Sequence, residues 1–194
     1  MERLVALGLD YNQFITRLPD NCFTRLHELY SFVAVENGLT LLQNGLFDNL
    51  TKLKAVYFAS NHISSIGEHL FDVTANLPNL TSIDLSHNNL TELDTWPVQR
   101  AQLIQGLKIY LSYNHISSFS NSLGWHYDCT SVPLLSETID LTFNNISHLN
   151  DLLRGWNISA LYASVLLRRC LKQRKVTIVY DTGATFETHC FITG

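Results

Sequence analysis

The triplet Asp181-Thr182-Gly183 is the stretch of this chain whose residue types could carry out catalysis. It follows an apolar run, Val176 to Tyr180, with the composition of a β-strand. An aspartate on a glycine-containing turn can share a proton with a second carboxylate, which is one basis of acid–base hydrolysis. The same triplet can instead form a hairpin turn, because Gly183 tolerates a positive φ and Asp181 can bond the turn backbone.

The triplet resembles the catalytic loop of aspartic proteases, above all the retroviral and retrotransposon kind. Such a protease would place most of its fold after this loop, but only 11 residues follow Gly183 and no second Asp-Thr-Gly is present. We therefore expect Asp181 to be the corner of a hairpin and the chain not to be an enzyme. A truncated aspartic-protease-like fragment is the remote alternative.

No other part of the sequence has the spacing of a catalytic or metal site. The eight histidines occur without a His-Glu-x-x-His or Cys-x-x-Cys pair, and His126, Asp128 and Cys129 match no metal-binding motif. There is no Gly-rich phosphate loop and no Gly-x-Ser-x-Gly sequence. We expect no catalytic residue, no metal and no cofactor.

Composition indicates a globular chain without a membrane span. Apolar residues make up 46% of the chain, charged residues 15%, and the net charge is −4. This mild charge favours no nucleic-acid partner. No apolar run approaches the roughly 20 residues of a spanning helix, and no secretory signal is visible, so Met1 is expected to begin a fragment or a mature chain.

One pattern recurs six times along the chain. Apolar residues lie five and three positions before an asparagine, and another lies two positions after it. The spacings between successive asparagines are 25, 24, 27, 26 and 30 residues, and the asparagines are Asn12, Asn37, Asn61, Asn88, Asn114 and Asn144.

The pattern resembles the leucine-rich repeat, L-x-x-L-x-L-x-x-N-x-L, over roughly residues 4–153. Its alternating core is a short strand that buries every second residue. The resemblance implies an α/β fold: a solenoid with a curved parallel sheet on its concave face. We expect about six repeats in a domain of residues 1–155. The asparagine amides should form a buried structural ladder that satisfies backbone groups left unpaired by the turns.

Aromatic residues on the opposite, convex side define the type of repeat. Phenylalanines in segments 21–26, 46–50 and 70–77 are expected to point inward. Such repeats with a phenylalanine spine resemble those of extracellular animal proteins, Toll-like receptor ectodomains among them. Gly106 and Ser136 replace the leading leucine in the last two copies, and segment 122–135 lengthens the unit between them into a loop of the kind that often carries function.

The concave face is the candidate binding surface. The residues four and one positions before each asparagine alternate with buried strand residues and should be exposed. In the later repeats they combine aromatic rings with carboxylates, a composition suited to a protein partner; they are Tyr57, Asp84, His87, Tyr110, Tyr113, Asp140 and Phe143. The alternative is an ordinary solvated sheet surface.

Five N-x-S/T sequons favour an extracellular or cell-surface chain that carries N-linked glycans; they start at Asn49, Asn79, Asn89, Asn145 and Asn157. Their placement is not independent of the fold, because Asn89 and Asn145 directly follow ladder asparagines.

Residues 156–194 form the expected C-terminal flank. Segment 156–175 reads as a helix with Asn157 as its N-cap and a basic end, followed by a β-hairpin. Among the four cysteines, Cys22 is expected to be a buried apolar thiol. We expect Cys170 to pair with Cys190, which would resemble the cysteine-stapled caps of extracellular repeat proteins. Cys129 could compete, and spacing does not choose among the three possible pairings.

Two hypotheses for function remain. The first is an extracellular leucine-rich-repeat module that binds another protein in a receptor, adhesion or matrix assembly. The second is a structural subunit that stacks end to end, because Leu4, Leu7 and Leu9 begin a repeat with no coil before them and the first strand has an open edge. We expect this edge to be covered, either by another copy of the same chain, which would then be the protein partner, or by an upstream segment absent from this sequence.

Overall fold

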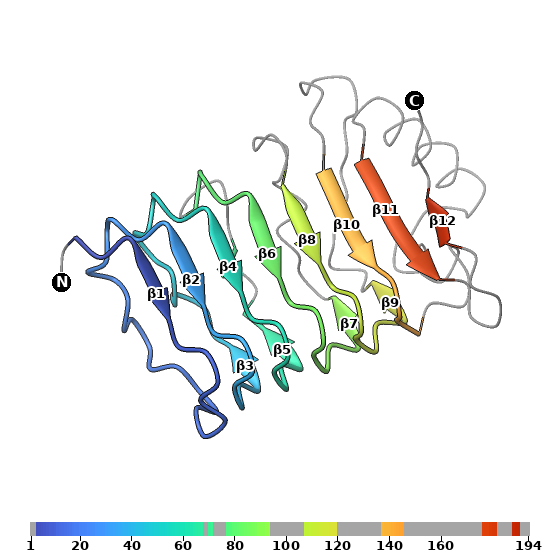
Figure 1. Cartoon of the computed structure of the whole chain (residues 1–194), viewed down its shortest axis with the longest axis horizontal. Coiled ribbons are helices and arrows are strands. Elements are labelled where there is room, and N and C mark those ends of the chain that lie inside the picture. The colour runs from blue at the N-terminus through green and yellow to red at the C-terminus, as the bar shows by residue number, and fades with distance from the viewer. Residues whose placement is uncertain are drawn as a thin grey trace.

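The computed structural model describes residues 3–67, 70–71, 77–93, 107–119, 137–145, 176–181 and 188–190. Strands lie side by side and the chain winds from one to the next, so that the described part of the chain forms a solenoid (Figure 1). We use "coil" for one turn of this winding, from the start of one strand of the large sheet to the next.

The large sheet has eight strands in the order β1-β2-β4-β6-β8-β10-β11-β12. Neighbours from β1 to β11 are parallel, and only β11 and β12 pair antiparallel. The strands are β1 (Ala6–Gly8), β2 (Ser31–Val33), β4 (Ala55–Tyr57), β6 (Ser82–Asp84), β8 (Lys108–Tyr110), β10 (Glu137–Leu141), β11 (Val176–Asp181) and β12 (Thr188–Cys190).

The register of the sheet follows the asparagine spacing in the sequence. Neighbouring strands from β1 to β10 are offset by 25, 24, 27, 26 and 30 residues, the same series as the six asparagines; the paired residues are Ala6↔Ser31, Ser31↔Ala55, Ala55↔Ser82, Ser82↔Lys108 and Lys108↔Thr138. The parallel solenoid predicted from the repeat is therefore confirmed.

Two smaller parallel sheets continue the coils beyond the large sheet (Figure 1). One pairs β3 (Leu41–Leu42) with β5 (Ser65–Ile66), and the other pairs β7 (Glu92–Leu93) with β9 (Ser118–Phe119). Each of these strands has only two residues. The turns of neighbouring coils are therefore joined mainly by single backbone hydrogen bonds, such as the one from His62 N to Leu39 O of the preceding coil at 2.9 Å.

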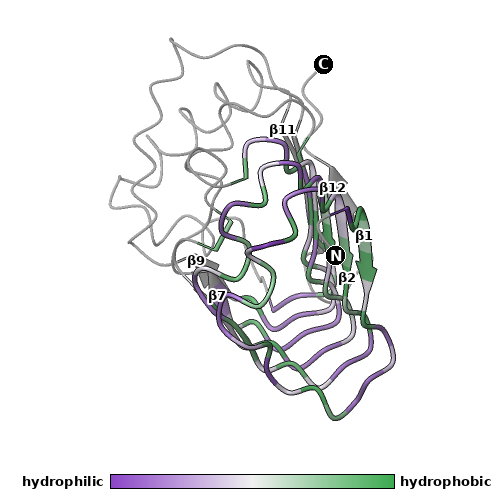
Figure 2. Ribbon diagram, turned by 90° about the vertical axis from the view of Figure 1, so that its left-hand side faces the viewer, coloured by the Kyte–Doolittle hydropathy of each residue, from purple (hydrophilic) through white to green (hydrophobic). Residues whose placement is uncertain are grey.

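The core runs through the inside of the solenoid. In β2, β4 and β6 the central residue is buried while its two neighbours are partly exposed, as for Phe32, Val56 and Ile83. Seen along the solenoid, the described coils lie behind one another, and the large sheet forms one wall (Figure 2).

Phenylalanines from both sides of the coils meet in this core. Phe23, Phe47 and Phe71, which were predicted to point inward, are 7%, 1% and 1% exposed. The ring of Phe47 lies 6.3 Å from each of the other two and 5.6 Å from that of Phe32, a strand residue. These edge and stacked contacts link successive coils through a continuous aromatic spine.

The asparagine side chains link the coils by a repeated pair of hydrogen bonds. Asn88 shows the pattern: its Oδ1 accepts from Ile63 N (2.9 Å), and its Nδ2 donates to Phe58 O (2.9 Å), both in the preceding coil. Asn61, Asn114 and Asn144 make the equivalent two bonds, all between 2.8 and 3.1 Å. Asn37, Asn61, Asn88 and Asn114 are buried, and Asn144 is half-buried.

Asn12 departs from the prediction, because it is exposed. Its Nδ2 donates only within its own coil, to Leu9 O and Asp10 O. Its backbone N donates to Asn37 Oδ1 (3.1 Å), a bond that in the later coils comes from the residue two positions after the asparagine. No described residue packs on the outer side of this coil, so the Asn12 amide stays exposed. The hydrogen bond to Asn37 Oδ1 also comes from Asn12 N and not from Phe14 N, the donor expected from the later coils.

The same cause exposes two apolar positions of the first coil. Phe14 is 98% exposed, although the equivalent Ile63 is 0% exposed. Cys22, predicted to be buried like the equivalent Leu46, is exposed with a free thiol. Partial burial still raises the pKa of the Cys22 thiol, against a backbone hydrogen bond that lowers it. These two positions of the end coil are exposed, whereas Phe23 of the same coil is buried, because a coil covered on one side only buries part of its apolar residues.

The expected C-terminal hairpin has its two strands in the described residues, but its first strand also extends the solenoid. β11 pairs with β12, Asp181 lying opposite Thr188, and it also continues the parallel sheet beside β10. The turn after Asp181, segments 122–135 and 156–175, Cys129, Cys170, Asn157 and the domain boundary after residue 155 lie outside the described residues.

We predict that Asn88→Ala destabilises the fold far more than Asn12→Ala. Removing the Asn88 amide leaves the Ile63 N–H and the Phe58 carbonyl without their side-chain partner, at about 1–3 kcal/mol per unpaired buried group. Asn12 is exposed, so its replacement should change the free energy of unfolding by within about 0.5 kcal/mol. Denaturant unfolding followed by circular dichroism measures both, and equal losses would contradict a buried ladder as the source of stability.

Candidate functional site

The candidate site lies on the outward side of the large sheet, here called the open sheet face. It is formed by the outward residues of the strands and by the residue that precedes each ladder asparagine. All seven binding residues expected from the sequence lie on this face, and all are partly or largely exposed: Tyr57, Asp84, His87, Tyr110, Tyr113, Asp140 and Phe143.

Parallel pairing arranges these residues in two rows that run across the strands. In the first row Tyr57 pairs with Asp84, Asp84 with Tyr110, and Tyr110 with Asp140. Neighbouring strands lie about 4.8 Å apart, so residues in one row are within side-chain reach of each other. The second row is formed by the residues that precede the ladder asparagines.

The second row has a left-handed backbone in every coil. The residue before each ladder asparagine has a φ between 53° and 61°, and the six are Tyr11, Glu36, Ser60, His87, Tyr113 and Phe143. This conformation is uncommon for residues other than glycine and asparagine. Backbone bonds to the following coil fix it, such as His87 N to Ser112 O (2.9 Å) and Tyr113 N to Thr142 O (3.0 Å).

Three of these residues form an aromatic stack on the surface. The ring centroids of His87 and Tyr113 lie 4.2 Å apart at 9°, and those of Tyr113 and Phe143 lie 4.2 Å apart at 14°. Tyr113 and Phe143 remain 46% and 44% exposed. The stack therefore presents a continuous aromatic strip across three coils, here called the ring stack.

The two aspartates of the first row are held by the turns that follow them. Asp84 Oδ1 accepts from Ser86 N (3.0 Å) and Ser86 Oγ (2.7 Å). Asp140 Oδ1 accepts from Thr142 N (3.0 Å) and Thr142 Oγ1 (2.8 Å). These turns fix one oxygen of each carboxylate, and no described residue bonds the other oxygen.

Sequence reasoning placed these residues on one face but missed two features of the site. It missed the left-handed backbone, because aromatic residues give no signal for a positive φ. It also missed the aspartate turns, although Asp84-Leu85-Ser86 and Asp140-Leu141-Thr142 share the Asp-x-Ser/Thr spacing that would have indicated them.

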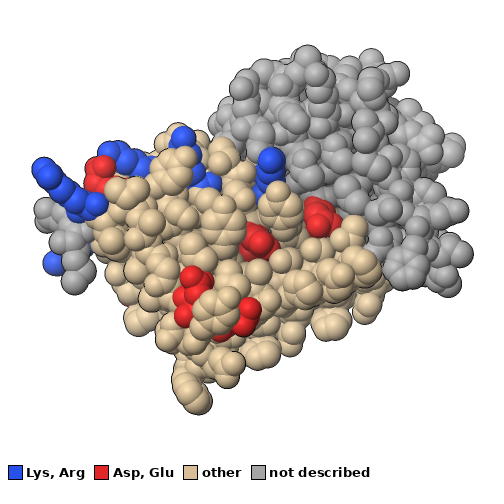
Figure 3. Space-filling view, in the orientation of Figure 1, with Lys and Arg blue, Asp and Glu red and all other residues tan. Residues whose placement is uncertain are grey.

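Charge is distributed unevenly over this surface. In the view of Figure 1, Lys and Arg side chains gather mainly along the border near the amino ends of the strands, while most carboxylates lie lower on the sheet (Figure 3). The described open sheet face carries Asp84 and Asp140 in its later coils, with Lys108 as the first residue of β8. Within the described ranges, no group of three or more His, Cys, Asp or Glu residues could hold a metal.

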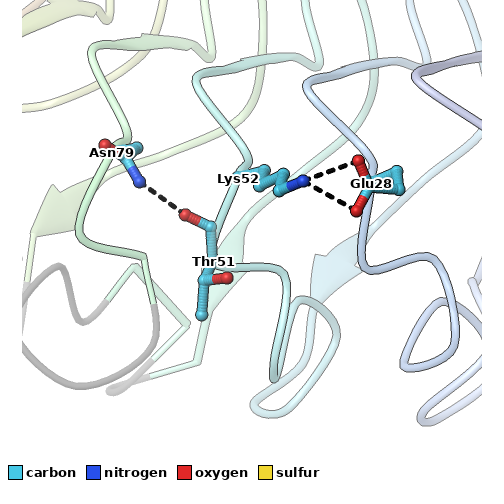
Figure 4. A network of polar contacts seen from close by, with 4 residues as sticks. All are labelled: Glu28, Thr51, Lys52 and Asn79. Carbon is cyan, nitrogen blue, oxygen red and sulfur yellow. Dashed lines mark hydrogen bonds and ion pairs between the residues drawn. The ribbon is translucent and has the colours of Figure 1, made fainter.

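The described sequons lie in turns and loops, away from the strands of the large sheet. Asn49, Asn79, Asn89 and Asn145 are all exposed. Asn79 Nδ2 donates to Thr51 O (2.7 Å), and beside this bond Lys52 pairs with Glu28 of the coil before it (Figure 4). An N-glycosylated amide keeps one N–H, so the Asn79 bond is compatible with a glycan.

Residues 27–90 match the family model described as leucine rich repeat. Fibromodulin from Gallus gallus is 38% identical over 109 residues, which are 45% of this chain and 28% of fibromodulin. The crystal structure of a TLR13–ssRNA13 complex superposes with a TM-score of 0.60 at 28% identity, covering 79% of this chain and 20% of that one. The chain thus spans less than a third of either protein. In the part of the chain that the structure describes, no helix is long and apolar enough to cross a bilayer.

We predict N-linked glycans on the secreted chain at Asn49, Asn79 and Asn157, and at Asn89 and Asn145. The four described side chains are exposed, so an oligosaccharyltransferase can reach them once the chain is in a secretory compartment. Intact mass before and after glycosidase measures occupancy, and each Asn→Gln replacement should remove one glycan. A secreted chain with no mass shift would contradict the prediction.

Proposed function

We propose that this chain, whose residues 27–90 match the leucine rich repeat model, is an extracellular module that binds another protein through its open sheet face. Such a module would serve in a receptor, an adhesion complex or a matrix assembly, and it would not be an enzyme. The observation that carries the proposal is the exposed ring stack, His87–Tyr113–Phe143.

The physical argument rests on how aromatic rings contribute to protein interfaces. Tyrosine and phenylalanine bury a large area on contact and lose little conformational entropy. Here the loss is smaller still, because ring-on-ring contact already holds the three rings, and backbone bonds to the following coil also hold His87 and Tyr113. A preordered aromatic strip on a rigid sheet is a suitable centre for a protein interface.

The similar proteins support a binding role in general terms. The matching TLR13 structure is a complex with ssRNA13, whereas the open sheet face of this chain carries Asp84 and Asp140, which would repel a phosphate backbone. We therefore propose a protein partner for the open sheet face and treat RNA as the competing outcome of the experiments below.

We predict that Tyr113→Ser weakens partner binding by about tenfold or more, as expected for an aromatic residue near an interface centre. The matched control is Tyr30→Ser, because Tyr30 is also 46% exposed but lies ahead of β2, where Lys54 Nζ packs over its ring. An array of secreted and cell-surface proteins identifies partners, and biolayer interferometry measures each variant. Partners that lose binding with Tyr30→Ser alone, or an array without partners, would contradict the proposal.

One observation favours end-to-end association as a second candidate function. The first coil exposes Tyr11 (73%) and Phe14 (98%), Val5 directly before it is 56% exposed, and β1 is the end strand of the sheet. An exposed apolar edge next to unpaired backbone groups is a template for association. A contact between this edge and the other end of a second copy would be heterologous and could propagate.

We predict that association through the first coil depends on Phe14. Phe14→Asp places a charge in the contact and should shift the chain to monomer, whereas Tyr30→Asp, outside the edge, should leave association unchanged. Sedimentation velocity over a concentration series measures the effect. A wild-type chain that stays monomeric throughout the series would rule out this second function.

A further inference from the structure

The first row of the open sheet face has an order that suggests the chemistry of the partner. Tyr110 is central, and its in-register neighbours are Asp84 on β6 and Asp140 on β10. With strands about 4.8 Å apart, the two carboxylates flank the tyrosine on either side. A carboxylate–aromatic–carboxylate row places a partly exposed ring between two acceptors, a composition that suits a cation.

The carboxylates are fixed before any partner arrives. In both residues Oδ1 is bonded by the N–H and the hydroxyl of the residue two positions later, at 2.7 to 3.0 Å. No described residue bonds Oδ2 of either aspartate or forms an ion pair with it. The carboxylates therefore lose little entropy on binding, and each keeps an oxygen available to a donor.

The surrounding charges leave this row acidic. Lys108 lies two residues before Tyr110 on the same strand and is exposed, but it forms no ion pair with any described carboxylate. The ring stack borders the row on the side of the ladder asparagines, and of its three members only His87 can carry a positive charge. A phosphate backbone would meet two aspartates here, whereas a cationic side chain would meet complementary charge.

Arginine fits this row better than lysine. Its planar guanidinium can stack on a tyrosine ring while its N–H groups bond carboxylates on both sides. The chain contains a related contact elsewhere, because Lys54 Nζ lies 5.0 Å from the centre of the Tyr30 ring.

We propose that the Asp84–Tyr110–Asp140 row binds an arginine of a basic segment in the protein partner, and that the ring stack packs against the rest of that segment. This inference rests on the proposed function and specifies its partner: a protein that presents arginine, rather than an acidic protein or RNA, to the later coils of the open sheet face.

The test compares oligoarginine, oligolysine and single-stranded RNA as labelled probes for the full chain, by fluorescence anisotropy at physiological ionic strength. Oligoarginine should bind most tightly, and Asp84→Asn/Asp140→Asn should weaken it by about tenfold. Asparagine keeps an Oδ1 acceptor for Ser86 and Thr142, so the turns should persist, and a thermal melt verifies this. Tyr110→Phe should retain binding and Tyr110→Leu should weaken it, because only the first keeps the ring.

The matched charge control is Asp20→Asn/Glu28→Gln, which removes two negative charges outside the large sheet. It should change oligoarginine binding by less than about twofold, because exposed charges at a distance are screened. Equal losses in both double variants would overturn the proposal by showing a general charge effect. Tighter binding of RNA than of oligoarginine would also overturn it.

Partners found on the protein array separate the two proposals. If they lose binding with Tyr113→Ser but not with Asp84→Asn/Asp140→Asn, the binding module stands and the arginine site is wrong. If the array gives no partner at all, both proposals fail.

Discussion

A side-chain amide that replaces missing backbone hydrogen bonds is the interaction on which the rest of this molecule depends. At each turn the chain leaves the sheet, and the buried N–H and C=O groups there lack backbone partners. Asn61, Asn88 and Asn114 each supply one acceptor and one donor to the coil before them. The sheet register, the aromatic spine and the surface rows all repeat with the period that these bonds set.

The bonds also determine the conformation of the residue before each asparagine. All six of these residues have a positive φ, and in the first five coils their N–H donates to the following coil, so the side chain is carried onto the open sheet face. His87, Tyr113 and Phe143 therefore stack because the coils stack, at the same 4.2 Å ring separation in both steps. A structural requirement at the asparagine thus produces an ordered surface one residue away.

The sequence predicted the sheet and its register because both follow from a spacing that can be counted. It failed at the first coil, where Asn12, Phe14 and Cys22 are exposed, because a repeat pattern treats every copy as equal while burial depends on the neighbours of each coil. It did not place β11 in the parallel sheet, because the sequence has Gly183 three residues after Tyr180, where the repeat pattern requires an asparagine. The two aspartates were placed correctly on the face, but their turns were missed, although both repeats have the Asp-x-Ser/Thr spacing that indicates them.

The left-handed residues have a consequence for how this protein could change over evolutionary time. Their conformation is imposed by neighbouring coils and is indifferent to the side chain, since tyrosine, glutamate, serine, histidine and phenylalanine all occupy it. Substitution there alters what the surface presents without altering the bonds that hold the coils together. Residues that hold the fold together and residues that contact a partner therefore occupy different positions. After gene duplication, substitutions in the second row alone could give a copy a new partner while its fold is kept.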